Sequence, residues 1–252
     1  MDLGIKGKNV LIVGASKGIG KTITLGFAEE GARITTLARS EGLLKTLHDE
    51  ISGFSPLDHA CYVDDIMNED ANQVAQKILQ ERGTFDIVVH NVGGSLVSRN
   101  ALGTIEEWEY AWKFNAGAAI AMNNALIPPM IEKGWGRVIH ISSVSAVMLR
   151  GNPLYASAKA FLNAYVTTVG RSIAASGVVL SAVMPGAVSF PGSYWDKYQV
   201  EDPARCEDFL RHHQAANRFG TTKEIAGVVL FMASEQASFM QTSIVAVDGA
   251  NM

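Results

Sequence analysis

The chain has 252 residues, of which 48% are hydrophobic and 18% charged, and its formal net charge is −4 at pH 7. This balance argues against nucleic acid or an anionic membrane surface as a partner, and no apolar run approaches the ~20 residues of a membrane span. Two cysteines, Cys61 and Cys206, provide no disulfide framework and favour a reduced, cytoplasmic setting. The N-terminus lacks the apolar segment of a signal peptide. The length fits one large α/β domain with a sizeable core.

A glycine-rich turn follows the first predicted strand. Residues 8–13 form a short β-branched run that leads into Gly14, Gly18 and Gly20, and residues 21–31 show the apolar spacing of a helix. Strand, turn and helix together favour a pyrophosphate site, because glycines let the group approach the backbone and the helix N-terminus offers free N–H groups. The spacing is Gly-x-x-x-Gly-x-Gly rather than the commoner Gly-x-Gly-x-x-Gly. A tight turn that binds nothing is the alternative.

The second predicted strand, residues 33–38, is followed by a basic residue rather than an acidic one. NAD-selective proteins of this architecture tend to present a carboxylate to the ribose 2′-hydroxyl at this place. Here Ala38 is followed by Arg39, and Lys17 lies in the glycine-rich turn. Two cations without an acid suit a 2′-phosphate, whose shape matches the planar guanidinium. The sequence therefore predicts NADP(H) in preference to NAD(H), with a solvated surface arginine as the alternative.

Strands and helices alternate along the rest of the chain. We predict further strands at residues 59–63, 85–90, 137–143, 178–183 and 244–247. Helices are predicted at residues 72–82, at 106–131 with an interruption near its end at Pro128 and Pro129, from Tyr155 to about 176, and at 222–233. This order predicts an α/β fold with a Rossmann-type, doubly wound parallel sheet covered by helices on both faces, in a single domain spanning residues 1–252.

Residues 190–218 are long for a connection in a compact domain, where ~4–6 residues is the median. They carry two prolines and five aromatic side chains among polar residues, namely Phe190, Tyr194, Trp195, Tyr198 and Phe209. We interpret this segment as a substrate lid with short helical pieces. A plain surface insertion is the alternative.

Tyr155 and Lys159 are four residues apart in a predicted helix, so their side chains lie on one face. An ammonium there would lower the pKa of the phenol, because a nearby positive charge favours the ionised form. Such a phenol can exchange a proton with a substrate oxygen, as general acid–base catalysis requires. The strand at 137–143 ends in Ser142 and Ser143, at the sheet edge where open α/β sheets bind ligands. Taken alone, the tyrosine and lysine are also consistent with a polar pair on an amphipathic helix.

Together these motifs resemble those of the classical short-chain dehydrogenase/reductase family over nearly the whole chain. The matching segments are the glycine turn, Asp65-Ile66 after the third strand, His90-Asn91-Val92-Gly93 after the fourth, Asn115, Ser143, Tyr155 and Lys159 at the places of a catalytic tetrad, Pro185-Gly186 after the sixth strand, and Arg218-Phe-Gly, Glu224-Ile-Ala and Val247-Asp248-Gly249 near the C-terminus. Each motif is weak alone, but six in the correct order are specific.

The resemblance implies roles for these residues. Tyr155 would exchange the proton with the substrate oxygen, Lys159 would tune it and bind the nicotinamide ribose, and Ser143 would orient the substrate oxygen. Asn115 would help to hold a water relay to Lys159. Ser142 is a rival to Ser143, because adjacent strand residues point to opposite faces, although the spacing from Asn115 favours Ser143. The implied cofactor-binding residues are Gly14, Ser16, Lys17, Gly18, Ile19, Gly20, Arg39, Asp65, Ile66, Asn91, Gly93, Tyr155, Lys159, Pro185, Gly186 and Val188.

Three positions depart from the family pattern. His90 and His140 stand where the family commonly has asparagine. Buried, hydrogen-bonded imidazoles are the favoured interpretation, and a metal pair is the alternative, for which no third ligand is evident, so we expect no metal site. Phe190 occupies a place where threonine often contacts the nicotinamide carboxamide, so this contact is expected to be absent or supplied by Ser189.

The resemblance implies an NADP(H)-dependent oxidoreductase that reduces a ketone to a secondary alcohol, reversibly. The alternative substrate is a 3-oxoacyl group on acyl-carrier protein, for which family members use basic residues before the fifth strand and after the tyrosine helix. Gly134-Trp135 and Ser176-Gly177 stand there, so a free small molecule such as a sugar, polyol or cyclic ketone is favoured, with flat aromatic faces for it in the lid. A non-catalytic NADP(H)-binding regulator is the alternative of a different class. The resemblance also implies a homotetramer.

Overall fold

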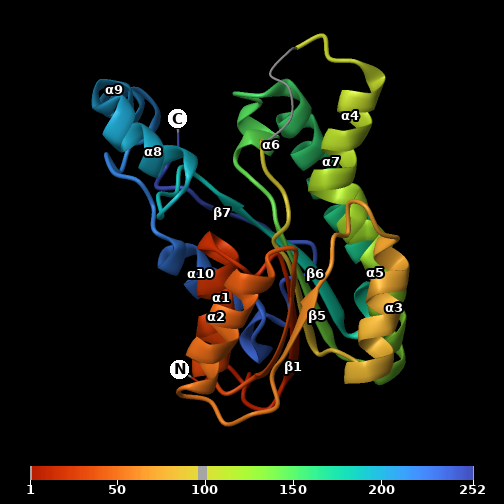
Figure 1. Cartoon of the computed structure of the whole chain (residues 1–252). Helices are drawn as coiled ribbons and strands as arrows, with labels where there is room; N and C mark the ends of the chain where they lie inside the picture. Colours follow the sequence, from red (N-terminus) through yellow and green to blue (C-terminus); the bar gives the residue numbers. More distant parts are fainter. Residues whose placement is uncertain (1, 96–100, 252) are drawn as a thin grey trace.

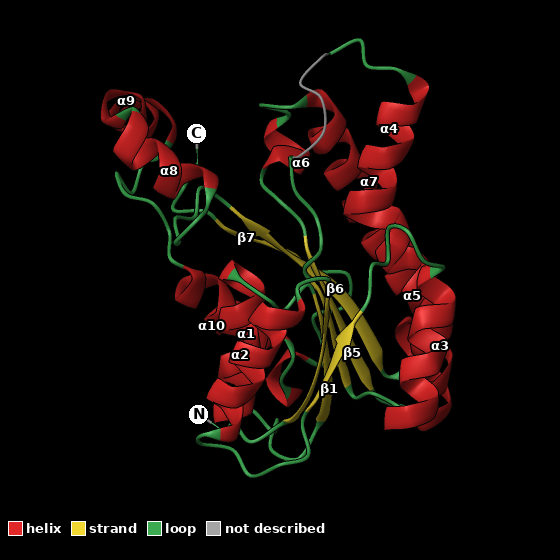
Figure 2. Cartoon of the chain, viewed as in Figure 1, coloured by secondary structure: helices red, strands yellow, loops and turns green. Residues whose placement is uncertain are grey.

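The computed structural model of the chain describes residues 2–95 and 101–251. At its centre is a seven-stranded sheet with the order β3-β2-β1-β4-β5-β6-β7, and every neighbouring pair is parallel (Figure 2). The strands are β1 (Asn9–Val13), β2 (Arg33–Ala38), β3 (Ala60–Val63), β4 (Ile87–His90), β5 (Gly136–Ile141), β6 (Val178–Pro185) and β7 (Ile244–Val247). The predicted Rossmann-type sheet is confirmed.

Helices cover both faces of the sheet (Figure 1). On one face lie α1 (Gly18–Glu29), α2 (Glu41–Ser52) and α10 (Thr222–Met232), and on the other α3 (Ala71–Arg82), α4 (Ile105–Trp112), α5 (Ala118–Lys133) and α7 (Pro153–Ile173). The shorter elements are α6 (Ser145–Met148), α8 (Tyr194–Glu201), α9 (Pro203–His213), the π-helical turn η1 (Lys113–Gly117) and the 3₁₀ turns η2 (Ala174–Ser176) and η3 (Glu235–Ala237). Within the described ranges, no helix combines the length and the apolar character needed to cross a membrane.

Strand β1 shows why the sheet needs a helical layer on each face. All of its residues are buried. Val10 and Ile12 belong to the core formed with α1, α2 and α10, whereas Leu11 and Val13 belong to the core formed with α3, α5 and α7. Because successive side chains of a strand point to opposite faces, a continuous apolar run has to be covered on both sides.

The order of the strands places the functional cleft. From β1 the chain builds outward through β2 and β3, and then returns to add β4 on the other side of β1. The direction of winding therefore reverses between β1 and β4. In open α/β sheets a crevice forms at this switch point, outside the carboxyl ends of the strands.

Two predicted boundaries are wrong. Pro128 and Pro129 lie inside α5 without interrupting it, and the helix continues to Gly134, which ends it in the left-handed conformation (φ 73°). The burial of Ile127 and Met130 on either side of the prolines offsets the lost backbone hydrogen bonds, since tertiary packing supplies most helix stability. Strand β5 ends at Ile141, so the predicted terminal serines lie just beyond the strand.

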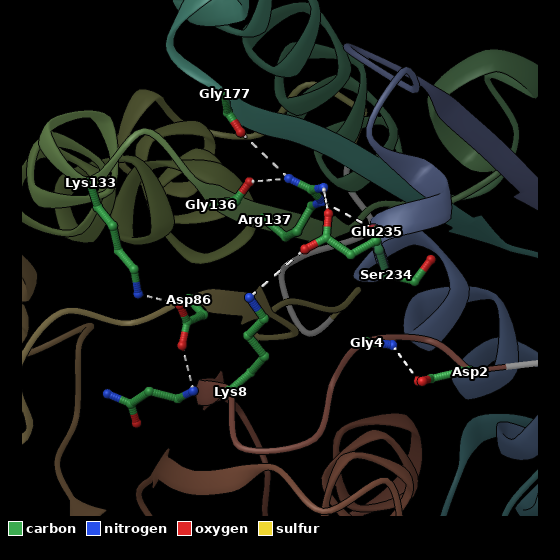
Figure 3. Close-up of polar contacts among 11 residues, drawn as sticks. Asp2, Gly4, Lys8, Asp86, Lys133, Gly136, Arg137, Gly177, Ser234 and Glu235 are labelled. Carbon is green, nitrogen blue, oxygen red and sulfur yellow. Dashed lines mark hydrogen bonds and ion pairs between the residues drawn. The ribbon is translucent and has the colours of Figure 1, made fainter.

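A buried arginine and its ion pair with a half-exposed glutamate connect the amino ends of the strands (Figure 3). Arg137, the second residue of β5, is 1% exposed, and it donates to the carbonyl oxygens of Ser234 and Gly136 at 3.3 and 3.0 Å. Its Nη2 lies 3.8 Å from Glu235 Oε2, and Lys8 Nζ lies 3.9 Å from the other carboxylate oxygen of Glu235. These contacts lie at the end of the sheet opposite to the crevice, where they help to hold the strands in place.

Candidate active site

A cleft of about 480 Å³ lies at the carboxyl ends of β1, β4, β5 and β6. It brings together Ser143, Tyr155 and Lys159 with most of the predicted cofactor residues, namely Gly14, Ser16, Lys17, Ile19, Arg39, Asp65, Ile66, Asn91, Gly93, Pro185, Gly186 and Val188. Gly18, Gly20 and Asn115 are not part of its wall. The wall also contains Ser40, Asp64 and Phe114, which the sequence reasoning missed. The first two lie within two residues of the ends of β2 and β3, and this position could have identified them.

The glycine turn has little room for side chains at its three glycines. Gly14 and Gly18 have positive φ values of 88° and 56°. A Cβ on Gly20 would lie 2.1 Å from the carbonyl oxygen of Gly14, and Asn91 Nδ2 donates to that same oxygen at 2.8 Å. Lys17, the N-cap of α1, makes no side-chain capping bond. The turn therefore has the geometry of a diphosphate site at a helix N-terminus, and Asn91 helps to hold it.

The arginine that follows β2 forms an ion pair with a carboxylate that follows β3. Arg39 Nη1 lies 3.7 Å from Asp65 Oδ2, and the two side chains are 59% and 26% exposed. The fold brings Asp65 from the end of β3 to the side of Arg39, so the prediction of two cations without an acid was incomplete. An ion pair this exposed is weak, which leaves the guanidinium able to exchange its partner for a phosphate.

Helix α7 begins just before Tyr155 because its start is capped. The side chain of Asn152 accepts from the backbone nitrogens of Leu154 and Tyr155 at 2.9 and 3.3 Å, and Pro153 occupies the first helical position. Asparagine followed by proline is a favourable helix start. The phenol is therefore presented from the first turn of a rigid helix.

Tyr155 and Lys159 lie on one face of α7, as predicted, with Lys159 Nζ 5.9 Å from the centroid of the Tyr155 ring. Lys159 is 3% exposed, and its Nζ donates to the carbonyl oxygen of Ile141 at 2.7 Å. Burial lowers the pKa of Lys159 to about 7. Burial also raises the pKa of Tyr155, against a hydrogen bond with Ser143 that lowers it. In the protein alone desolvation therefore dominates, which is the reverse of the lowering expected from the ammonium.

The two serines after β5 make different contacts, although both line the cleft. Ser142 donates to Asn163 Oδ1 at 2.6 Å. Ser143 is the serine that contributes to lowering the pKa of the Tyr155 phenol, and its Oγ accepts from the backbone nitrogen of Ser145 at 3.1 Å. Of the two serines, Ser143 is therefore the one that acts on the phenol.

Asn115 lies behind the cleft in the π-helical turn η1 and is 2% exposed. Its Oδ1 accepts from the backbone nitrogen of Gly94 at 2.9 Å, and its Nδ2 donates to the carbonyl oxygens of Gly94 and Ala111 at 3.2 and 3.0 Å. A Cβ on Gly93 would lie 2.8 Å from Asn115 Oδ1 and 2.9 Å from Lys159 Nζ. Asn115 and Lys159 therefore flank the same glycine, and Asn115 acts on the loop after β4.

The segment after β6 crosses the glycine turn. Val188 forms a β-bridge with Gly220, and the ring of Phe190 lies so close to Gly18 that a Cβ there would be 2.5 Å from it. The Oγ of Ser189 accepts from Gln199 Nε2 at 2.7 Å, so Ser189 is engaged by the lid. Val188 and Phe190 line the cleft, whereas Ser189 is not part of its wall.

The predicted lid contains the two helices α8 and α9, joined by an aromatic cluster. Trp195 packs against Phe209 and Phe219 with ring centroids 4.2 and 5.0 Å apart, and it also lines the cleft. At the other end of the segment, Arg150 Nη1, from the connection between α6 and α7, donates to Nδ1 of His213, the last residue of α9, at 2.9 Å. The segment thus contacts the connection that precedes α7.

His90 and His140 come together as buried, stacked rings with centroids 4.8 Å apart. Each makes a side-chain hydrogen bond to Asn123. The predicted buried, hydrogen-bonded imidazoles are confirmed. In the part of the chain that the structure describes, no three His, Cys, Asp or Glu side chains gather in a way that could hold a metal ion.

The chain is similar to known oxidoreductases along almost its whole length. The family model described as enoyl-(acyl carrier protein) reductase matches residues 14–250. A 3-oxoacyl-[acyl-carrier-protein] reductase of Thermotoga maritima is 31% identical over 252 residues, covering 97% of this chain and 98% of that protein. A glucose 1-dehydrogenase of Gluconobacter oxydans is 29% identical, covering 96% of this chain and 91% of that protein.

Among solved structures, the L-sorbose reductase of Gluconobacter frateurii, in complex with NADPH and L-sorbose, has a TM-score of 0.90 and 28% identity, covering 99% of this chain and 98% of that one. Each of these proteins is an oxidoreductase by its name. The match of the family model agrees with the parallel sheet, the glycine turn and the Ser143, Tyr155 and Lys159 arrangement. The chain belongs to the short-chain dehydrogenase/reductase family of oxidoreductases.

Proposed function

We propose that the protein is an NADP(H)-dependent reductase that converts a ketone of a small molecule, such as a sugar, a polyol precursor or a cyclic ketone, to the secondary alcohol and also catalyses the reverse oxidation. The observation that carries the proposal is the meeting of Ser143, Tyr155 and Lys159 in the cleft that also contains the glycine turn. A reductase of this type needs a proton donor beside its coenzyme.

The cleft fits a nicotinamide coenzyme with a 2′-phosphate. The glycine turn has positive φ at Gly14 and Gly18, no space for a Cβ at Gly20, and the N-terminus of α1 behind it, which suits a diphosphate. Lys17 and Arg39 lie in the same wall, and these two cations suit the extra phosphate. The L-sorbose reductase was crystallised with NADPH, which supports the same coenzyme here. When bound, such a coenzyme supplies the hydride.

The chain's own residues handle the proton and the orientation of the substrate. Tyr155 donates its proton to the carbonyl oxygen in reduction and accepts it from the hydroxyl in oxidation. Ser143, which contributes to lowering the pKa of Tyr155, donates to the same oxygen and fixes its position. Lys159 in its ammonium form stabilises the tyrosinate, because an opposite charge favours the ionised phenol.

The substrate end of the cleft favours a compact, uncharged molecule. Phe190 and Trp195 supply apolar aromatic surface there, which suits the faces of rings. Lys133 is the basic residue immediately before Gly134 and Trp135, and it is paired with Asp86, so its charge is already partnered. We therefore place a free sugar, polyol or cyclic ketone ahead of an acyl group on an acidic carrier protein.

A 3-oxoacyl-[acyl-carrier-protein] reductase is the second candidate. The relative from Thermotoga maritima, which has this name, is 31% identical and matches 98% of its own length. Both candidates use the same proton donor, and they differ in whether the ketone is on a free molecule or on a thioester.

The proposal includes a role for the segment 190–218 as a lid and an assembly into a homotetramer. The lid is supported by Trp195, which joins the cleft wall to the aromatic cluster. The assembly is supported by exposed aromatics on α4 and α7, where Trp112 and Phe161 are 43% and 46% exposed and pack edge to face. Sedimentation velocity of the wild type and of Phe161→Glu tests the assembly, and a wild-type monomer would contradict it.

The function is tested by a substrate panel of keto-sugars, cyclic ketones and 3-oxoacyl thioesters, followed by NADPH absorbance. We expect turnover of a keto-sugar or cyclic ketone, its loss in Tyr155→Phe, and normal turnover in Tyr62→Phe, where the phenol lies on β3 and bonds Glu81. Turnover of acyl thioesters alone would select the second candidate. NADPH binding without turnover of any carbonyl would favour the regulator.

A further inference from the structure

A buried polar cluster lies behind the catalytic lysine and is not used by the proposed reaction. His90 ends β4 and His140 is the neighbouring residue of β5, and the two are directly paired in the sheet. They are 3% and 0% exposed, and their rings are stacked at 4.8 Å with an interplanar angle of 18°. Two imidazoles this close and this buried have to be kept from becoming charged together, since burial and like charge both disfavour protonation.

The amide of Asn123, on α5, joins the two rings. Its Oδ1 lies 2.8 Å from His90 Nε2, and its Nδ2 donates to His140 Nε2 at 3.2 Å. The same Nδ2 donates to the hydroxyl of Tyr165 on α7 at 3.1 Å. One amide oxygen and both amide hydrogens therefore have partners within the cluster.

This arrangement sets the tautomers of both rings. The amide oxygen accepts a hydrogen bond from His90, so His90 carries its proton on Nε2. The amide nitrogen donates to His140, so Nε2 of His140 must be bare and its proton must be on Nδ1. If His140 were protonated at Nε2, its N–H would point at the N–H of the amide, and two donors would face each other. Geometry as well as burial therefore disfavours this protonation.

Burial also disfavours protonation of both imidazoles. It lowers the pKa of His90 to about 4. It also holds the pKa of His140 well below the usual value, with smaller contributions from the charges of His90 and Lys159. Both rings are neutral at neutral pH.

The cluster reaches Lys159 through the strands that carry the histidines. Lys159 Nζ donates to the carbonyl oxygen of Ile141, the residue after His140, and it lies 2.9 Å from where a Cβ of Gly93 would be, three residues after His90. The titratable groups that interact with Lys159 are His140 from β5 and Tyr155 from α7 itself, and His90 from β4 acts on His140. Among the described residues no carboxylate pairs with Lys159.

We propose that Asn123 is a positioning residue for Lys159: by holding His90 and His140 in complementary neutral tautomers, it fixes the ends of β4 and β5 on which the lysine rests and keeps positive charge away from it. The catalytic meaning of this inference rests on the proposed function, because Lys159 matters through Tyr155. The inference about the tautomers and the position of Lys159 does not rest on the proposed function, and it is tested without measuring turnover.

The tautomers are read directly from the wild-type protein by NMR with ¹⁵N-labelled histidine. We expect His90 to show the Nε2–H form, His140 to show the Nδ1–H form, and neither to titrate between about pH 5 and 8, with assignments from His90→Asn and His140→Asn. The same tautomer on both rings, or titration of either ring with an ordinary pKa, would overturn the inference.

The link to Lys159 is tested with Asn123→Asp and with Asn124→Asp, its matched control at the exposed neighbouring position of α5. A carboxylate at 123 accepts from both rings, so it moves the proton of His140 to Nε2 and raises the His140 pKa. The ¹³Cε resonance of Lys159, assigned with Lys159→Met, should then gain a second titration step at the new His140 pKa. Adding His140→Asn should remove this step, and Asn124→Asp should lack it.

A Lys159 titration curve that is the same in both aspartate variants would sink the link, as would a second step that survives His140→Asn. Circular dichroism shows whether the variants are folded, and the wild-type tautomers decide the inference if Asn123→Asp is not. In the reductase assay, kcat of Asn123→Asp should fall about tenfold as the pH is lowered through the step, with KM unchanged. A protein with the expected tautomers and no reductase activity would refute the proposed function and leave the cluster as inferred.

Discussion

Lys159 Nζ donates its hydrogen bond to the backbone carbonyl of Ile141 at 2.7 Å, and not to the phenol of Tyr155, whose ring centroid is 5.9 Å away. The lysine is thus anchored to the end of β5. It can act on Tyr155 through space while its position is set by the sheet. Its burial makes its charge sensitive to pH, which leads to the first prediction.

Replacing Lys159 with Met should change how stability depends on pH. The folded pKa of Lys159 is lowered from 10.5 to about 7 by burial, so between these values the unfolded chain binds more protons than the folded one. The free energy of unfolding of the wild type should therefore rise from about pH 7 toward pH 10 relative to Lys159→Met, by at most ~1.4 kcal/mol per pH unit. Urea unfolding across this range measures the difference, and parallel curves for the two proteins would contradict the lowered pKa.

Alanine substitutions of the two serines after β5 should have different effects on kcat and on stability. Ser143→Ala removes the hydroxyl that helps to lower the pKa of Tyr155 and should lower kcat by about 10²-fold, the lower range for a group acting on the transferred proton. Ser142→Ala removes a bond to Asn163 and should cost about 1 kcal/mol of stability with a much smaller effect on kcat. Steady-state kinetics and thermal unfolding of both variants decide the case. Equal losses of kcat would show that the assignment to Ser143 is wrong.

A methyl group on Gly18 should disturb the glycine turn. It would lie 2.5 Å from the ring of Phe190, and the residue has φ 56°, so Gly18→Ala should destabilise the protein by about 1 kcal/mol or more and weaken NADPH binding. Gly42→Ala is the control, because this helical glycine has nothing within 4 Å of a Cβ and should gain up to ~1 kcal/mol. The readouts are urea unfolding and fluorescence titration with NADPH. Adding Phe190→Ala to Gly18→Ala should recover part of the lost stability and NADPH binding. If neither recovers, the steric conflict is not with Phe190.

Truncation of Trp195 should affect the substrate more than the coenzyme. Trp195 lines the cleft and packs on Phe209 and Phe219, so Trp195→Ala removes apolar surface and loosens α8 against α9. We expect KM for a cyclic ketone or keto-sugar to rise about tenfold, the scale of a lost aromatic contact, with the NADPH dissociation constant within about twofold of wild type. Phe239→Ala, at a side chain that is 100% exposed, serves as the control. An unchanged KM would exclude Trp195 from the substrate site.

Much of this architecture could be predicted from the sequence because its signals are local. The run from Asn9 to Val13 is apolar without alternation, so it predicts a strand buried on both faces, and the spacing of Tyr155 and Lys159 is fixed by helix geometry. Gly14 and Gly18 mark backbone that other residues rarely adopt. These features depend on neighbours in the chain, and the structure has them where they were expected.

The remaining features depend on residues that are distant in sequence. Asp65 meets Arg39 only because β3 lies beside β2, and Asn123 reaches His90 and His140 only because α5 packs on that face of the sheet. Burial reversed the expected direction for the pKa of Tyr155, and burial at one residue depends on the whole fold. Helix α2 was also missed, although its buried residues Leu44, Leu47 and Ile51 have the spacing of an amphipathic helix, so here a local signal was overlooked.

The π-helical turn at Lys113–Gly117 has a consequence for the length of this segment. Because α4 and α5 continue on either side of it, the stretch from Ile105 to Lys133 is in effect one rod that carries a surplus residue. Because the wide turn already takes up the surplus residue, deleting one residue within it would restore regular winding and leave α4 and α5 in nearly their present orientation. Deleting one residue from the regular part of α4 or α5 would instead rotate the two parts of the rod by about 100° relative to each other, and either the Trp112 side or the Met122 side would turn away from its neighbours. The rod therefore tolerates a one-residue deletion at the turn better than one in the regular helix.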